Sequence, residues 1–110
     1  MTASWAYIYE HPETDPVADR TVIERAGQRT LLVPVSSSAE APGVARRLVD
    51  EDGVGLVELC GGFSLVDAAR VAEELAGDVP VGHVTFAVDS TKAVTEYAQR
   101  FEAATSYSAG

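Results

Sequence analysis

The chain has 110 residues, of which 46% are hydrophobic and 23% charged, and 17 acidic against 8 basic side chains give a net charge of -9. This length predicts one domain, residues 1–110, with a core of its own, and the negative charge disfavours nucleic acids and anionic membranes as partners. We expect a cytoplasmic protein, because there is no basic and apolar leader, no apolar run of roughly 20 residues, and only one cysteine.

Four segments have the aliphatic and aromatic composition of β-strands: residues 4–10, 29–35, 55–60 and 80–88. The connection between the first two is ambiguous. Asp15 followed by Pro16 is a typical helix start, whereas the β-branched residues 21–23 favour an irregular loop with a short strand. Both alternatives remain open.

Amphipathic helices are predicted between the later strands and after the last one. Residues 41–53 have Pro42 in the first turn and Gly53 as a stop, and residues 91–105 form a final helix. Residues 64–78 carry an apolar stripe of Leu65, Ala68, Ala69, Ala72 and Leu75. A helix that joins consecutive strands implies a right-handed crossover between parallel strands. The predicted fold is therefore α/β: a small three-layer sandwich on a mostly parallel four-stranded sheet, flavodoxin-like or Rossmann-like, with an extra C-terminal helix.

The stretch "VELCGGFS", residues 57–64, places a strand end before a tight turn and a helix. Loops at the carboxyl ends of parallel strands build sites, and here the amides of Gly61 and Gly62 could hold a phosphate or carboxylate. Cys60 is a candidate nucleophile or a buried packing residue. His11 and Ser36 follow the first two strands at the same edge, although a plain turn with helix caps accounts for such residues equally well.

Glu58 is the most informative residue, because strands inside a parallel sheet are normally apolar on both faces. A carboxylate there needs a partner, and we expect His83 or the hydroxyls of Tyr7 and Tyr9 to supply one. A Glu58–His83 pair would exchange protons near neutral pH, but a purely structural pair remains an alternative.

Metal-ligand spacings are absent, as are nucleotide-binding glycine motifs and the serine hydrolase elbow, so no cofactor and no metal is expected. With "ELCGGF" at residues 58–63, "VPVGHVTF" downstream and a first strand leading into "PETDP", the chain resembles a family of short bacterial proteins classified as a domain of unknown function. The resemblance covers roughly residues 6–88 and leaves out the helix of residues 91–105. It implies that the residues of the "ELCGGF" motif belong to one site or turn.

Two functions are compatible with these residues. The first is a cofactor-independent isomerase, lyase or cyclase of a biosynthetic pathway, with Glu58 and His83 as acid and base and the glycine amides holding developing negative charge. The second is a non-catalytic module that binds a small organic molecule or a protein. Val94, Tyr97 and Phe101 form an apolar stripe on the last helix, which predicts a homodimer.

Overall fold

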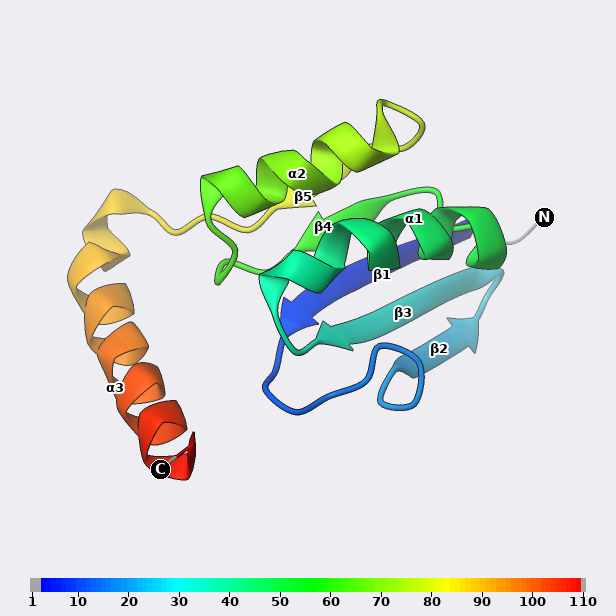
Figure 1. Cartoon of the computed structure of the whole chain (residues 1–110). Helices are drawn as coiled ribbons and strands as arrows, with labels where there is room; N and C mark the ends of the chain where they lie inside the picture. The colour runs from blue at the N-terminus through cyan, green and yellow to red at the C-terminus, as the bar shows by residue number, and fades with distance from the viewer. Residues whose placement is uncertain (1–2, 110) are drawn as a thin grey trace.

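The computed structural model describes residues 3–109, which fold into an α/β domain with a single sheet (Figure 1). The strands are β1 (Ala3–Glu10), β2 (Thr21–Arg25), β3 (Gln28–Val35), β4 (Val57–Leu59) and β5 (Val81–His83). The helices are α1 (Ala41–Asp52), α2 (Leu65–Leu75) and α3 (Thr91–Ala109), with the short 3-10 turns η1 (Ser38–Glu40) and η2 (Val88–Ser90) before α1 and α3. Within these residues, no helix has both the length and the apolar content to cross a bilayer.

The sheet is mixed, with the strand order β2-β3-β1-β4-β5. β3, β1, β4 and β5 run parallel to their neighbours, whereas β2 pairs antiparallel with β3. The predicted four-stranded sheet is therefore wrong in strand number, because residues 21–25 form a hairpin with β3. Of the two alternatives for the connection, the loop with a short strand is the one found.

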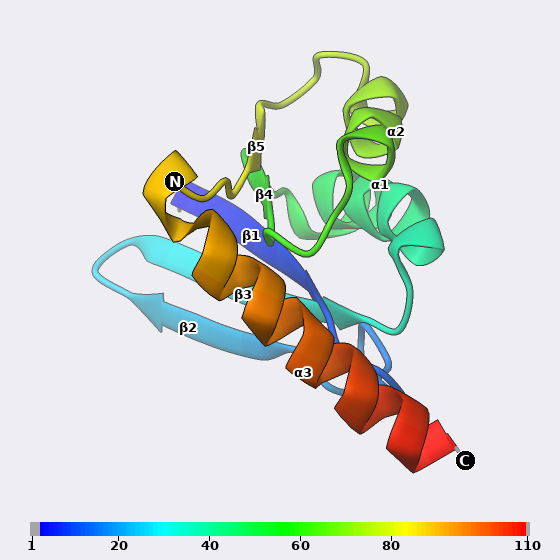
Figure 2. The ribbon, with the colours of Figure 1, turned by 90° about the vertical axis from the view of Figure 1, so that its left-hand side faces the viewer.

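Both crossover helices lie on the same face of the sheet, and α3 stands off its carboxyl edge (Figures 1 and 2). The cause is topological. From β3 to β4 and from β4 to β5 the chain moves in one direction across the sheet, and right-handed crossovers in one direction place their helices on one side. A third layer requires a crossover in the other direction, and the loop and hairpin after β1 supply none. The predicted three-layer, flavodoxin-like arrangement is not confirmed.

Capping residues set the limits of the two packed helices. Pro42 lies in the first turn of α1, and Gly53 ends this helix with a φ of 68°, as predicted. Ser64 caps α2, because its side chain accepts a hydrogen bond from the backbone amide of Asp67. The buried side of α2 is formed by Val71 and Leu75.

The predicted apolar stripe of α2 is wrong at three of its five positions, since Leu65 is 77% exposed and Ala69 and Ala72 are exposed as well. Ala68 is partly buried and Leu75 is buried, as predicted. Helical periodicity locates a stripe only to within one residue in each turn, and the angle at which α2 crosses the sheet selects the row that is buried.

The core fills the space between α1, α2 and the covered face of the sheet. Alternate residues of each strand point into it, as the period of a strand requires. The buried hydrophobic residues are Ala6, Ile8, Leu31, Val33, Val35, Ala41, Val44, Ala45, Leu48, Val54, Val57, Leu59, Phe63, Val71 and Leu75.

The opposite face, called the open face below, carries the intervening strand residues. Register and alternation assign them, because residues paired across parallel strands lie on the same side. None of its larger side chains except Pro34 is fully buried. The open face consists of Ala3, Trp5, Tyr7, Tyr9, Thr21, Ile23, Arg25, Gln28, Thr30, Leu32, Pro34, Leu56, Glu58 and Gly82.

Candidate functional site

A cavity of about 330 Å³ lies on the open face, toward the amino ends of the strands. Two of its walls define its chemistry: Trp5 provides an aromatic surface and Glu58 a carboxylate. Of the predicted site residues, Glu58 lines this cavity, whereas the residues predicted at the carboxyl edge of the sheet do not. The residues that line the cavity are Ala3, Ser4, Trp5, Gln28, Leu56 and Glu58.

Glu58 lies in the middle of the open face, opposite Tyr7 on β1 and Gly82 on β5. A Cβ atom at Gly82 would lie 3.3 Å from the Cγ atom of Glu58, so the glycine makes room for this side chain. The Glu58 side chain is partly buried, and no described residue donates a hydrogen bond to its carboxylate. The site thus contains a hydrogen-bond acceptor that is available to a ligand, because no described residue donates to it.

Tyr7 and Tyr9 continue the open face next to Glu58. Their rings stack, with 6.3 Å between centroids and 21° between planes. Burial raises the pKa of the Tyr7 hydroxyl, and the nearby Cys60 and Glu58 raise it further. Tyr7 is therefore a neutral hydroxyl at physiological pH, able to donate a hydrogen bond. Cys60 is a free, partly buried thiol that packs against the core.

The predicted Glu58–His83 pair is not formed. His83 is opposite Leu59, one residue further along β4 than Glu58, and consecutive strand residues point to opposite faces. The Nε2 atom of His83 lies 2.9 Å from the carbonyl oxygen of Phe63 and takes part in a hydrogen bond with it. This bond holds the turn before α2 against β5, which gives His83 a structural contact.

The turn at Gly61 and Gly62 is occupied by other parts of the chain. A Cβ atom at Gly61 would lie 2.6 Å from the ring of Phe86, so the ring contact accounts for this glycine. A Cβ atom at Gly62 would lie 3.5 Å from a carboxylate oxygen of Glu10. Burial raises the pKa of Glu10, and the nearby charge of Asp67 raises it further. Two carboxylates beside the turn disfavour an anion there.

His11 and Ser36 lie at the carboxyl ends of β1 and β3, outside the cavity lining. The Nδ1 atom of His11 lies 3.0 Å from the carbonyl oxygen of Pro12, and the hydroxyl of Ser36 donates a hydrogen bond to Glu40. Both bonds are local to their loops. The structure therefore brings together Tyr7, Tyr9 and Glu58, but neither His11 nor Ser36 joins them.

Trp5, Leu56 and Gln28 line the cavity but were not predicted as site residues. Strand alternation gave a signal for Trp5, which shares a face with Tyr7 and Tyr9. Ser4 was also missed. Its hydroxyl oxygen is buried and makes no hydrogen bond to a described residue. Ser4 alternates with Trp5 in β1, so its side chain belongs to the covered face of the sheet, although the residue lines the cavity.

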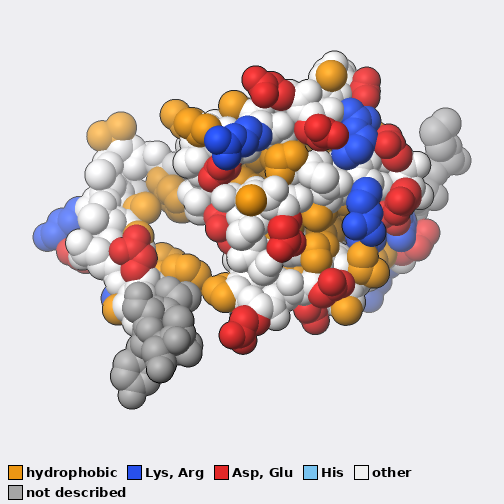
Figure 3. Space-filling model, viewed as in Figure 1, with side chains coloured by type: hydrophobic (Ala, Val, Ile, Leu, Met, Phe, Trp, Pro, Cys, Tyr) orange, Lys and Arg blue, Asp and Glu red, His pale blue; other side chains and the backbone are white. Residues whose placement is uncertain are grey.

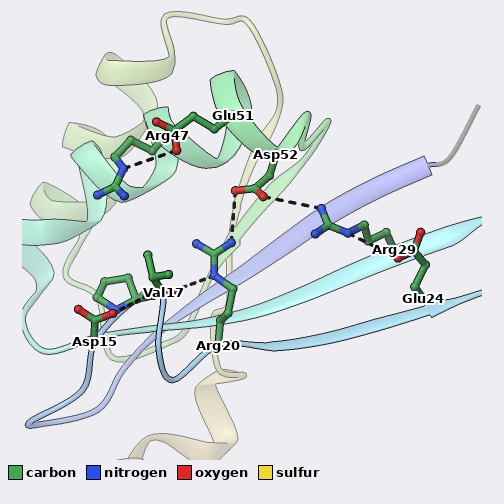
Figure 4. Close-up of polar contacts among 9 residues, drawn as sticks. Asp15, Val17, Arg20, Glu24, Arg29, Arg47, Glu51 and Asp52 are labelled. Carbon is green, nitrogen blue, oxygen red and sulfur yellow. Dashed lines mark hydrogen bonds and ion pairs between the residues drawn. The ribbon is translucent and has the colours of Figure 1, made fainter.

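A second cavity, of about 260 Å³, separates the loop of residues 11–20 from α1. Figure 4 shows that its arginines are matched by acids: Arg20 lies 3.3 Å from Asp52, which is 3.9 Å from Arg29, and Arg47 lies 3.9 Å from Glu51. The Arg20–Asp52 pair fastens the loop to α1, Arg29 joins β3 to the same carboxylate, and the Arg47–Glu51 pair lies within α1. We therefore assign this region a structural role.

Within residues 3–109, no group of three or more histidine, cysteine, aspartate or glutamate side chains is placed to hold a metal ion.

Comparison with known proteins gives a family for the chain. No curated protein and no solved structure matches it. A family of unknown function, DUF6506, matches residues 3–99. The match extends past residue 88, where the resemblance seen in the sequence ended, and includes the first half of α3. The chain belongs to the DUF6506 family of unknown function.

Proposed function

We propose that the open face binds a small organic molecule, with an apolar ring against Trp5 and a hydrogen-bond donor on Glu58. One observation carries this proposal: a partly buried carboxylate lies beside an aromatic wall, and no described residue donates a hydrogen bond to it. Partly desolvated carboxylates are stabilised by a donor or a cation, and a ligand that brings one gains binding energy from the match. Non-catalytic binding, one of the two functions considered from sequence, is thus the one that the geometry supports best.

The chemistry of the cavity favours a cationic or neutral ligand. A volume of about 330 Å³ is at the lower end of the range of small-molecule sites, about 300–1,000 Å³. The face of a tryptophan attracts cations, and the chain has a net charge of -9, which repels anions. An organic amine with one aromatic or aliphatic ring fits these features.

Trp5 is the only tryptophan of the chain and lines this cavity, so a ligand bound there changes a fluorescence signal to which no other tryptophan contributes. The experiment titrates the protein with benzylamine, benzyl alcohol and benzoate, which share a ring but differ in charge. We expect a saturable change with affinity falling in that order. Glu58→Gln should weaken benzylamine binding by about tenfold, or about 1.4 kcal/mol, while benzyl alcohol changes little.

Glu73→Gln is the matched control, because it removes the same charge from an exposed position on α2. It should leave all three affinities unchanged. Equal affinities for the three probes, unaltered by Glu58→Gln, or no change in Trp5 emission at millimolar concentrations, would overturn the proposed site.

A second candidate function is proton transfer in an isomerase, lyase or cyclase. The observation that favours it is the pairing of Glu58 with Tyr7, a hydroxyl whose raised pKa keeps it protonated. Glu58 would remove a proton from a carbon next to a carbonyl group, Tyr7 would donate a hydrogen bond to the carbonyl oxygen, and the proton would return at another carbon. In this case Glu58→Gln and Tyr7→Phe should each abolish turnover while a neutral ligand still quenches Trp5.

We also propose a cytoplasmic location, since Cys60 is a free thiol and reduced thiols persist in that compartment.

A further inference from the structure

The sheet has a covered face and an open face, although parallel sheets usually have both faces covered. The open face carries three aromatic side chains of β1 together with Leu32 and Leu56. In the described chain, α1 and α2 occupy the other side (Figure 2). A further layer is therefore expected on the open face.

Among the described residues, α3 is the helix that packs least against the rest of the domain. Its main contacts are with η2, the turn that directly precedes it, and it stands apart from the globular body (Figures 1 and 3). Tyr97 is 64% exposed and Phe101 46% exposed on its apolar stripe, and Phe86 and Val88 in the connection to α3 are 57% and 91% exposed. Figure 3 shows hydrophobic side chains on both sides of the gap between α3 and the body.

The solvent-accessible surface of the chain is larger than that of a compact monomer of the same mass. A compact monomer of 11.6 kDa exposes about 5,800 Å², whereas this chain exposes 7135 Å², an excess of about 1,300 Å². A standard interface buries about 800 Å² on each partner, so the excess is enough for a stable dimer. The radius of gyration, 14.9 Å, likewise exceeds the value of about 13 Å for a compact chain of this length.

Length and charge match α3 to the open face. A helix of 19 residues is about 28 Å long, and a strand of eight residues about 26 Å. In α3, Lys92 and Arg100 balance Glu96 and Glu102, and on the open side of the sheet Arg25 balances Glu58. Both surfaces are therefore neutral in a chain of net charge -9, so they are the parts of two copies that approach each other with the least repulsion.

We propose that the chain forms a homodimer in which α3 of each copy packs on the open face of the other. The stripe of Val94, Tyr97 and Phe101 then covers the aromatic residues of β1. The match of the DUF6506 family to residues 3–99 includes this stripe up to Tyr97. Resting on the proposed function, the exchange also completes the site, because the second copy's helix shields the cavity at Glu58 from water and contributes aromatic surface to it.

The first measurement is the mass of the full chain in solution, which light scattering should give as twice 11.6 kDa at micromolar concentration. Tyr97→Asp together with Phe101→Asp should convert the dimer to a monomer. The far-ultraviolet circular dichroism of this double variant should be largely retained, because the buried core cluster contains no residue of α3. A monomeric mass for the unaltered chain overturns the proposal.

The second measurement identifies which surfaces meet. Two variants are made in a Cys60→Ser background, one with Leu32→Cys on the open face and one with Tyr97→Cys on α3. They are mixed, allowed to exchange copies, treated with a short bismaleimide and resolved by intact mass. We expect the heterodimer to be the main covalent product. Gln99→Cys is the matched control in place of Tyr97→Cys, since it lies about 200° around the helix and should react far less.

Each alternative arrangement gives a different result. Dominant linkage between two Leu32→Cys copies would show open faces packed against each other, and dominant linkage between two Tyr97→Cys copies would show paired helices. A chain carrying both cysteines that links only within itself would show α3 folded onto its own sheet. Any of these outcomes overturns the exchange. The cross-link is measured without any added ligand, and the ligand titration does not depend on it, so failure of the ligand site and failure of the dimer give different results.

Discussion

Glu10 at the carboxyl end of β1 and Asp15 in the loop after it have pKa values that their surroundings shift in opposite directions. Asp15 accepts hydrogen bonds from the backbone amides of Val17 and Ala18, at 2.9 and 2.7 Å, and these bonds lower its pKa. Burial raises the pKa of Glu10, and the charge of Asp67 raises it further. Asp15 therefore favours the folded state when ionised, and Glu10 when protonated.

Glu10→Gln tests this difference. Because the folded-state pKa of Glu10 is raised, its stabilising contribution is complete below the unfolded pKa of about 4.3 and is lost as the pH rises through the folded pKa. At pH 7 the wild type carries the unfavourable charge and the variant does not. We expect a modestly higher melting temperature for the variant at pH 7, and no difference below about pH 4.

Glu73→Gln again serves as the control for the loss of one negative charge, since Glu73 is exposed on α2. A gain of the same size for both variants would attribute the effect to the net charge of -9 rather than to the position of Glu10.

At the level of elements, the hairpin of β2 and β3 depends on a two-residue turn. Ala26 and Gly27 both have positive φ values, 54° and 75°, which suit the right-handed twist of hairpin strands but strain alanine. The hairpin adds an edge strand whose five residues are all exposed. Its stability thus rests on the turn and on backbone pairing with β3 more than on burial.

Ala26→Asn should stabilise the protein by about 0.5–1 kcal/mol, because asparagine followed by glycine is the preferred pair for this turn. Urea denaturation monitored by Trp5 fluorescence measures the change. Gly27→Ala, which places a side chain at a φ of 75°, should destabilise the chain. The same sign for the two substitutions would show that the turn has another geometry in solution.

For the whole molecule, charge and shape act against each other. The net charge of -9 keeps copies apart, while the uncovered face of the sheet and α3 favour association. If the proposed contact surfaces are neutral, the repulsion between copies comes from the remaining surface, which faces solvent and is screened by salt.

Dimerisation should therefore strengthen with ionic strength. We expect the dissociation constant of the dimer, measured by analytical ultracentrifugation, to fall when NaCl is raised from about 10 mM to about 150 mM, as the screening length shortens from about 30 to about 8 Å. An interface held by ion pairs would show the opposite trend, and the assignment of neutral surfaces would then be wrong.

Local structure follows from the sequence wherever a single residue has a strong conformational preference. Pro42 and Gly53 set the limits of α1, and the aliphatic runs before and after this helix became the parallel strands β3 and β4. Alternation also placed Glu58 on the same face as the first-strand tyrosines, because the side-chain period of a strand does not depend on the rest of the fold.

Contacts between these elements depend on the packing of the whole chain. His83 and Glu58 are both in strands of the same sheet, but the register of β5 against β4 sets them on opposite faces, and register depends on contacts between segments far apart in the chain. The direction of the two crossovers left one face of the sheet open, and hydrophobic periodicity within α3 does not specify what its apolar stripe contacts. An apolar stripe favours burial of one side of a helix, but the surface that this side contacts is set by the packing of whole elements.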